Sequence, residues 1–119
     1  MLRIKNDIVP PFLHPKLSDE DLPTGVSFAS AGSGYDELTT VASGVIPVLK
    51  QAHYFKEHLV RLQRIVGEKQ AKKMVNGALV IVSAGTNDFG FNYYDVPTRK
   101  IEFNISGYQD FLQKRLETC

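Results

Sequence analysis

The spacing of apolar residues predicts helices in three parts of the chain. In the longest, six apolar residues recur every three or four positions and form one stripe along a helix surface: Val48, Ala52, Phe55, Leu59, Leu62 and Val66. Pro47 suits the first turn of this helix and Gly67 its end. A shorter helix is predicted from Glu68 to about Val75. A final helix is predicted by Ile105, Tyr108, Phe111, Leu112 and Leu116.

Two other segments have the pattern of strands. Residues 25–29 (Gly-Val-Ser-Phe-Ala) alternate in character, which predicts a short strand. Residues 78–83 (Ala-Leu-Val-Ile-Val-Ser) form an apolar run that is typical of a strand covered on both faces. Each segment runs into a turn of small residues, at 30–34 and 84–89. The order strand, helices, strand, helix predicts an α/β layered fold with a parallel sheet.

Composition narrows the classes of protein that fit this pattern. Residues 1–24 contain four of the six prolines and are predicted to form an irregular lead-in to the α/β portion, residues 25–119. The 119 residues are 43% hydrophobic, which is typical of one soluble globular domain. A formal charge of +1 argues against a nucleic-acid or anionic-membrane partner. No apolar stretch reaches the roughly 18 residues that a membrane span needs.

The few cysteines and histidines also limit the chemistry. Cys119 is the single cysteine, so no internal disulfide is expected. It has no metal-ligand spacing with the three histidines, and we expect no metal and no cofactor. The first residues lack the apolar run of a secretory signal, which predicts a cytoplasmic chain.

The two small-residue turns are the candidate functional site. Binding sites of parallel α/β sheets gather at the carboxyl ends of the strands, where both turns are expected. Gly32 offers a backbone N–H with little steric cover, and Asn87 offers a side-chain amide with two hydrogens. Two such donors that converge on one point can stabilise an oxyanion. Each turn alone is also consistent with a structural turn or helix cap, and residues 32–34 lack the spacing of a phosphate-binding loop.

Together, residues 25–36 (Gly-Val-Ser-Phe-Ala-Ser-Ala-Gly-Ser-Gly-Tyr-Asp) and 83–89 (Ser-Ala-Gly-Thr-Asn-Asp-Phe) resemble the plant GDSL esterase/lipase family, a branch of the SGNH hydrolases. The resemblance covers residues 4–116, and the branch it is most similar to is the extracellular lipases. It implies a flavodoxin-like α/β/α sandwich. It also implies that Gly32 is the oxyanion glycine of the second sequence block and Asn87 the oxyanion asparagine of the third.

Two sequence blocks expected from this resemblance do not occur in these residues. The sequence contains no Gly-Asp-Ser, which carries the family's nucleophile. It contains no Asp-x-x-His either, because Pro11, Lys50 and Phe55 stand three residues before the histidines. We therefore expect a single partial GDSL domain, residues 1–119, truncated at both ends. It would lack the first strand–helix unit and the C-terminal third of the sandwich.

A substitute nucleophile within the chain is a weaker alternative. Ser30 and Ser33 lie in the first turn, and a Ser–His pair can be assembled from distant parts of a sequence. However, His53 and His58 fall within the long predicted helix, where His58 is expected to be partly exposed. The sequence therefore favours a site without a nucleophile or base.

Three hypotheses on function follow. The first is a member of a carboxylic-ester hydrolase family, inactive by itself because the catalytic Ser and the Asp-x-x-His are missing. Its substrate would be a small-molecule acyl ester or lipid, with no partner protein implied. The second is a non-catalytic protein that binds a lipid or ester. The third, with less support, is a phosphate or nucleotide binder. Members of the family are usually secreted, which disagrees with the cytoplasmic prediction.

Overall fold

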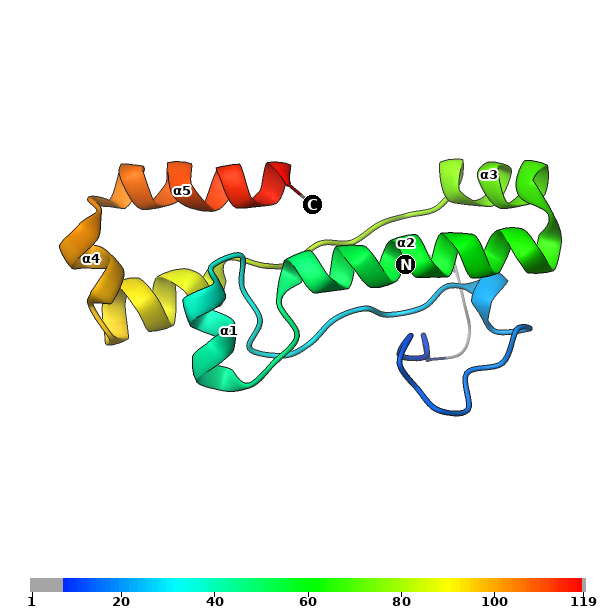
Figure 1. The fold of residues 1–119 in the computed structure, drawn as a ribbon, viewed down its shortest axis with the longest axis horizontal. Helices are drawn as coiled ribbons and strands as arrows, with labels where there is room; N and C mark the ends of the chain where they lie inside the picture. The colour runs from blue at the N-terminus through cyan, green and yellow to red at the C-terminus, as the bar shows by residue number, and fades with distance from the viewer. Residues whose placement is uncertain (1–7, 119) are drawn as a thin grey trace. The chain divides into compact units, whose positions relative to one another are not determined.

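The computed structural model describes residues 8–118, and helices are its regular elements (Figure 1). In chain order they are η1 (Leu22–Thr24), α1 (Glu37–Ser43), α2 (Val48–Val66), α3 (Glu68–Asn76), η2 (Asp88–Asp95), α4 (Thr98–Glu102) and α5 (Ile105–Glu117). The chain divides into two compact units. Within the described part, the first unit comprises residues 8–29 and 54–80, and the second comprises 30–53 and 81–118.

The three predicted helices are confirmed as α2, α3 and α5. Gly67 separates α2 from α3 with a φ of +82°, a conformation that favours glycine. The Gly77 N–H closes α3 by donating to the carbonyls of Lys73 and Met74. At the start of α5, the Asn104 side chain accepts a hydrogen bond from the Gly107 N–H at 2.7 Å. Local sequence signals therefore set the ends of these helices.

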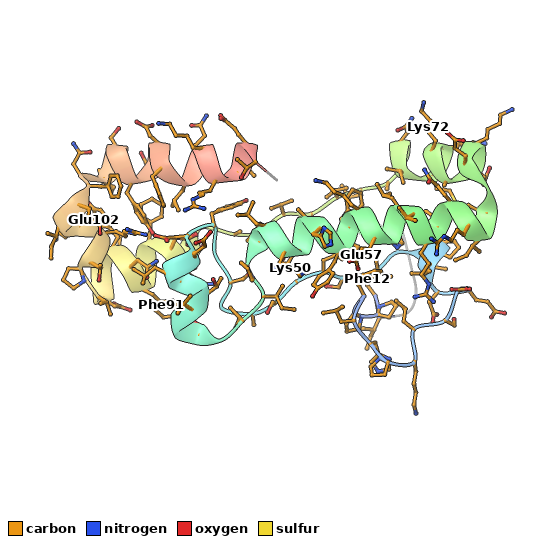
Figure 2. All side chains as sticks on the ribbon, in the orientation of Figure 1. Phe12, Lys50, Glu57, Lys72, Phe91 and Glu102 are labelled. Atoms are coloured by element: carbon orange, nitrogen blue, oxygen red, sulfur yellow. The ribbon has the colours of Figure 1, made fainter. Side chains whose placement is uncertain are left out.

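The first unit is built on the contact between α2 and α3. Helix α3 turns back along the end of α2 (Figure 1), and Leu62 packs against Ala71 and Leu22. Partly buried hydrophobic residues surround them: Phe12, Leu17, Val26, Val66 and Val75. Lys72 points outward from α3 (Figure 2). The proline-rich lead-in is thus part of a core.

His58 is buried in this unit, so the prediction that it is partly exposed is wrong. Only 7% of the residue is exposed, and its ring packs against the rings of Phe12, Phe28 and Phe55. Within the described residues its Nδ1 has no hydrogen-bond partner. Burial, aided by the positive charge of Arg61, lowers the pKa of His58. The helical periodicity gave the wrong exposure for His58 because it does not show that the lead-in, through Phe12, covers the side of α2 that carries His58.

The strand predicted at residues 25–29 does not form in the described structure. Ser27 instead makes an isolated parallel bridge with Pro11. The Ser27 N–H donates to the Pro10 carbonyl at 2.9 Å, and the Phe12 N–H donates to the Ser27 carbonyl at 2.8 Å. The next hydrogen bond of this ladder toward the N-terminus would need a backbone N–H at residue 10, which Pro10 lacks, so the pairing does not continue on that side.

The strand predicted at residues 78–83 is also absent from the described structure. The segment is extended and has no neighbouring strand among residues 8–118. The four side chains from Leu79 to Val82 are between 57% and 81% exposed, whereas a strand covered on both faces was predicted. Apolar composition identifies a segment suited to a central strand, but a strand also needs a partner to accept its hydrogen bonds. The described residues therefore contain no parallel sheet.

The second unit packs α5 against η2, with α4 between them in the chain (Figure 1). Its core consists of Tyr93, Tyr108 and Leu112. Four further aromatic residues pack against this core: Tyr35, Phe89, Phe103 and Phe111. The ring of Tyr108 stacks on that of Tyr93 with a centroid separation of 5.5 Å. This unit contains both turns that the sequence singled out.

Candidate functional site

Gly32 lies in a tight turn in the second unit. The Ser33 N–H donates to the Ser30 carbonyl at 3.2 Å, and Gly32 has a φ of +84°. This arrangement fits a type II turn, which needs glycine at its third position. In the described part of the chain the Gly32 N–H donates to no protein acceptor. The turn therefore presents a backbone donor, as the sequence predicted.

Asn87 lies in the second turn, immediately before η2. Its side-chain Nδ2 donates a hydrogen bond of 2.9 Å to the backbone carbonyl of Ser33. Ser33 follows Gly32 directly, so this bond joins the two turns although they are more than fifty residues apart in sequence. An asparagine amide has two hydrogens, and the bond to Ser33 uses one of them.

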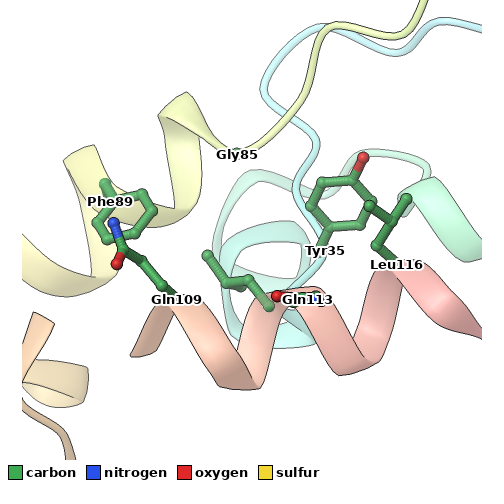
Figure 3. A pocket seen from close by; sticks show the side chains of 7 residues that line it. Tyr35, Gly85, Phe89, Gln109, Gln113 and Leu116 are labelled. Atoms are coloured by element: carbon green, nitrogen blue, oxygen red, sulfur yellow. The ribbon is translucent and has the colours of Figure 1, made fainter. Parts of the chain in front are cut away.

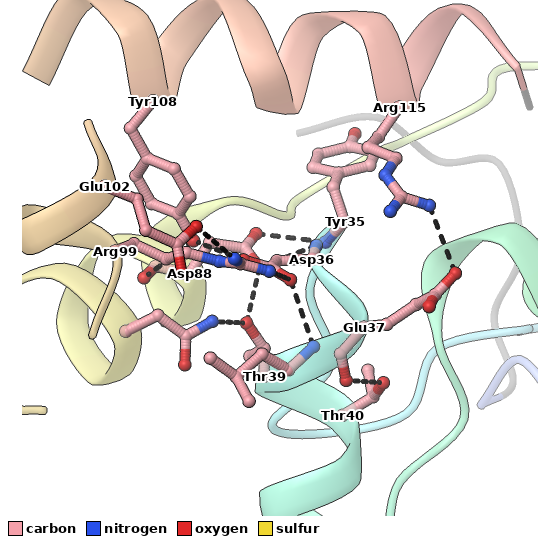
Figure 4. Close-up of polar contacts among 12 residues, drawn as sticks. Tyr35, Asp36, Glu37, Thr39, Thr40, Asp88, Arg99, Glu102, Tyr108 and Arg115 are labelled. Carbon is pink, nitrogen blue, oxygen red and sulfur yellow. Dashed lines mark hydrogen bonds and ion pairs between the residues drawn. The ribbon is translucent and has the colours of Figure 1, made fainter. Parts of the chain in front are cut away.

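Asp88, the residue after Asn87, fixes the two segments together more firmly. Its carboxylate accepts hydrogen bonds from the Tyr35 N–H at 3.0 Å, the Asp36 N–H at 3.0 Å and the Thr39 hydroxyl at 2.6 Å (Figure 4). The residue is completely buried. Gly34 makes room for it, since a Cβ there would stand only 2.6 Å from the Asp88 carboxyl carbon. Backbone and side-chain donors thus hold this buried carboxylate against the start of α1.

Asp36 is a second buried carboxylate, and it has a charged partner. Its side chain caps α1 by accepting from the Leu38 N–H at 3.0 Å. Arg99 forms two hydrogen bonds with it, from Nε at 2.7 Å and from Nη2 at 3.0 Å. The Tyr108 hydroxyl donates to it at 3.1 Å. Burial by itself would raise the pKa of Asp36, but the hydrogen bonds from Arg99 and Leu38 outweigh it and lower the pKa.

The partners of Asp36 are themselves tied into the second unit. The bond to Asp36 raises the pKa of Arg99, which also pairs with Glu102 at 2.6 Å. Burial raises the pKa of the Tyr108 hydroxyl, and the nearby charge of Asp36 adds to the effect. Both groups therefore keep their protons at neutral pH. The network connects the start of α1 with η2, α4 and α5.

The sequence analysis did not predict this network. Asp36 and Asp88 both lie in the two segments that carry the family resemblance, but only the glycine and asparagine were assigned roles. The position of Asp36 just before a helix is an N-cap signal that identifies its bond to Leu38. No local signal pairs Asp36 with Arg99, because 63 positions separate them.

The structure gives the two serines of the first turn other contacts. The Ser30 hydroxyl accepts from the Ile46 N–H at 3.1 Å, and the Ser33 hydroxyl accepts from the Gln51 side chain at 3.0 Å.

Among residues 8–118, no cluster of His, Cys, Asp and Glu is arranged to hold a metal ion. Within the same residues, no helix has the length and apolarity to cross a membrane.

Comparison with curated proteins identifies relatives over almost the whole chain. GDSL esterase/lipase At2g31550 of Arabidopsis thaliana is 56% identical over 117 residues, which are 98% of this chain and 32% of the relative. The Arabidopsis GDSL esterase/lipases At2g31540 and At2g42990 are 55% identical over 98% and 50% identical over 87% of this chain. The chain spans about a third of the length of the curated relatives it matches. No family model and no solved structure matches it. The chain therefore belongs to the plant GDSL esterase/lipase family.

Proposed function

We propose that this chain carries the oxyanion-binding part of a serine ester hydrolase, with the Gly32 N–H and the Asn87 amide as donors. The observation that carries the proposal is the 2.9 Å bond from Asn87 to the Ser33 carbonyl, which joins the two donor turns. The printed names of the relatives, GDSL esterase/lipase, support ester hydrolysis as the reaction of the whole protein.

The geometry suggests how each donor acts. The bond to Ser33 orients the Asn87 amide through one hydrogen, which leaves the other for an oxyanion. The Gly32 N–H is directed by the fixed φ of its turn and by the Asp88 contacts behind it. When a serine attacks an ester carbonyl, negative charge develops on the carbonyl oxygen, and preorganised donors stabilise that charge.

The nucleophile and base are not assigned to any residue of this chain. The sequence contains neither Gly-Asp-Ser nor Asp-x-x-His, and the hydroxyls of Ser30 and Ser33 accept hydrogen bonds from groups other than histidine. In this proposal the 119 residues bind an ester carbonyl but do not cleave it. In the whole protein, residues 78–83 would form a strand of the flavodoxin-like sheet, which accounts for their apolar composition.

An ester assay on the 119-residue chain tests the division between binding and cleavage. With p-nitrophenyl butyrate, we expect no burst of p-nitrophenol and no turnover above that of buffer. Turnover that a serine-reactive phosphonate abolishes would show that the chain has its own nucleophile and would overturn this part of the proposal.

A further inference from the structure

One asparagine of this chain, Asn104, lies in the sequence pattern that marks an acceptor of N-linked glycans. The pattern is Asn-x-Ser or Asn-x-Thr, with any residue except proline in the middle. Asn104, Ile105 and Ser106 fit it, and none of the other asparagines has Ser or Thr two positions later. Because so short a pattern also arises by chance, its use depends on where the structure places it.

The structure places the pattern on the surface of the second unit, at the start of α5 (Figure 1). The residues Asn104, Ile105 and Ser106 are all exposed. In contrast, Asn92 is only 4% exposed, and the Asn87 amide donates to a backbone carbonyl. The asparagine that the sequence pattern selects is therefore accessible to a large modifying enzyme.

The two ends of the Asn104 amide have different surroundings. The Oδ1 atom caps α5 by accepting from the Gly107 N–H at 2.7 Å. The fit is close, since a Cβ on Gly107 would stand 3.2 Å from this oxygen. The Nδ2 atom, which is the one that accepts a glycan, makes no hydrogen bond to any residue between 8 and 118. Because Oδ1 is turned toward the helix, Nδ2 points away from it.

The helix cap explains Asn104 but does not explain Ser106. Ser106 is the second residue of α5, and the cap uses the N–H of Gly107 instead. In the described part of the chain the Ser106 hydroxyl makes no hydrogen bond. A hydroxyl at this position belongs to the pattern that the glycan-transferring enzyme recognises. An exposed and unengaged hydroxyl is therefore in the state that recognition requires.

We propose that Asn104 carries an N-linked glycan when the whole protein is made in the secretory pathway. The co-reactant is an oligosaccharide joined to a lipid through a diphosphate. The Nδ2 atom forms a bond to C1 of the first sugar and loses one proton, while the bond from C1 to the phosphate oxygen breaks and the lipid diphosphate leaves. The Oδ1 atom is unchanged, so the modified side chain still caps α5. This inference is independent of the oxyanion donors.

A glycan at Asn104 would begin at the far end of α5 from the stretch that faces the two turns. That stretch contains Gln109, Gln113 and Leu116, which line a hollow together with Tyr35 (Figure 3). Asn104 does not line this hollow. At about 1.5 Å of rise per residue, Leu116 lies about 18 Å further along the helix. Attachment at Asn104 is therefore compatible with an open site at the turns.

The test uses a full-length chimera, in which this chain replaces the matching stretch of the 56%-identical Arabidopsis relative. The chimera is made in plant cells behind an added secretory leader, together with a secreted protein of known N-glycosylation. We expect mass spectrometry of its peptides to find a glycan on Asn104. An enzyme that releases N-linked glycans should convert this residue to aspartate. An unmodified Asn104 in a secreted chimera, with the companion protein glycosylated, would overturn the proposal.

Variants of the pattern give matched controls. Asn104→Asp removes Nδ2 but keeps an oxygen that can cap α5, and Ser106→Ala removes only the hydroxyl. Each should lose one glycan from the chimera. Ser106→Thr should keep that glycan, as should Asn76→Asp, which changes an exposed asparagine outside the pattern. The same number of glycans in all four variants would contradict the assignment to Asn104.

Thermal unfolding of the chimera tests whether the glycan leaves the cap intact. We expect the glycosylated chimera to melt no lower than Asn104→Asp, because both retain an oxygen that accepts from the Gly107 N–H. Asn104→Ala should melt at a lower temperature than either, since it has no cap. A glycosylated chimera that melts as low as Asn104→Ala would show that the glycan displaces the cap and would overturn the geometry proposed here.

Discussion

Replacement of Asp88 by alanine tests the idea that its buried carboxylate holds the two turns together. The change removes the acceptor for the backbone N–H groups of Tyr35 and Asp36 and for the hydroxyl of Thr39. Thr39 keeps a hydrogen bond from Asn92, so the main cost comes from the two backbone donors. An unsatisfied buried donor costs about 1–3 kcal/mol, which gives a loss of about 2–6 kcal/mol in the free energy of unfolding. That is a large part of the roughly 5–15 kcal/mol that stabilises a domain.

Urea unfolding followed by near-ultraviolet circular dichroism measures this loss, since Tyr93 and Tyr108 pack in the same unit. Asp95→Ala is the matched control, because Asp95 ends η2 and is exposed. We expect the control to change the unfolding free energy by less than about 0.5 kcal/mol. If Asp88→Ala and Asp95→Ala unfold with the same free energy, Asp88 does not hold the turns and the reasoning is refuted.

Two further predictions concern the buried charges. Arg99→Met leaves the Asp36 carboxylate buried without its charged partner. We expect the free energy of unfolding to fall by about 3 kcal/mol at pH 7. This loss should shrink below about pH 4, because Asp36 becomes protonated there and no longer needs a cation. Arg115→Met, which breaks a more exposed pair, should cost at most about 1 kcal/mol in the same pH-dependent urea titration. His58 has a lowered pKa, so the unfolded chain binds its proton more readily, and stability should fall as the pH drops below about 6.5. Between pH 7 and pH 5, the melting temperature of His58→Leu should change less with pH than that of the unmodified chain, whereas His53→Gln should keep the pH dependence of the unmodified chain. The same pH dependence in both variants would contradict the burial of His58.

The helices could be predicted from the sequence because their signals are local. The apolar stripe of α2 and the glycine that follows it lie within about twenty positions, and the same is true of α3 and α5. The two strands could not be judged in this way. Residues 78–83 have the composition of a buried strand, but pairing depends on a second strand, and residues 8–118 contain none that pairs with them.

The candidate site was predictable only in part for a similar reason. The family resemblance pointed to Gly32 and Asn87, and the structure brings their turns together. The carboxylates of Asp36 and Asp88 find their partners across 49 to 72 positions, which no periodicity or motif spacing encodes. The exposure of His58 was misjudged because an irregular, proline-rich segment contributes to its burial, and such segments have no amphipathic pattern.

The central claim is that Asn87 donates to an oxyanion. Its most direct test is kcat of a chimera in which this chain replaces the matching stretch of the 56%-identical Arabidopsis relative. We expect Asn87→Ala to lower kcat for p-nitrophenyl butyrate by about 10²–10³-fold with little change in KM, because the donor acts on charge that develops in the transition state. Asn76→Ala, at the exposed end of α3, should leave kcat unchanged. A folded Asn87→Ala chimera with the same kcat as the unmodified chimera would contradict the account.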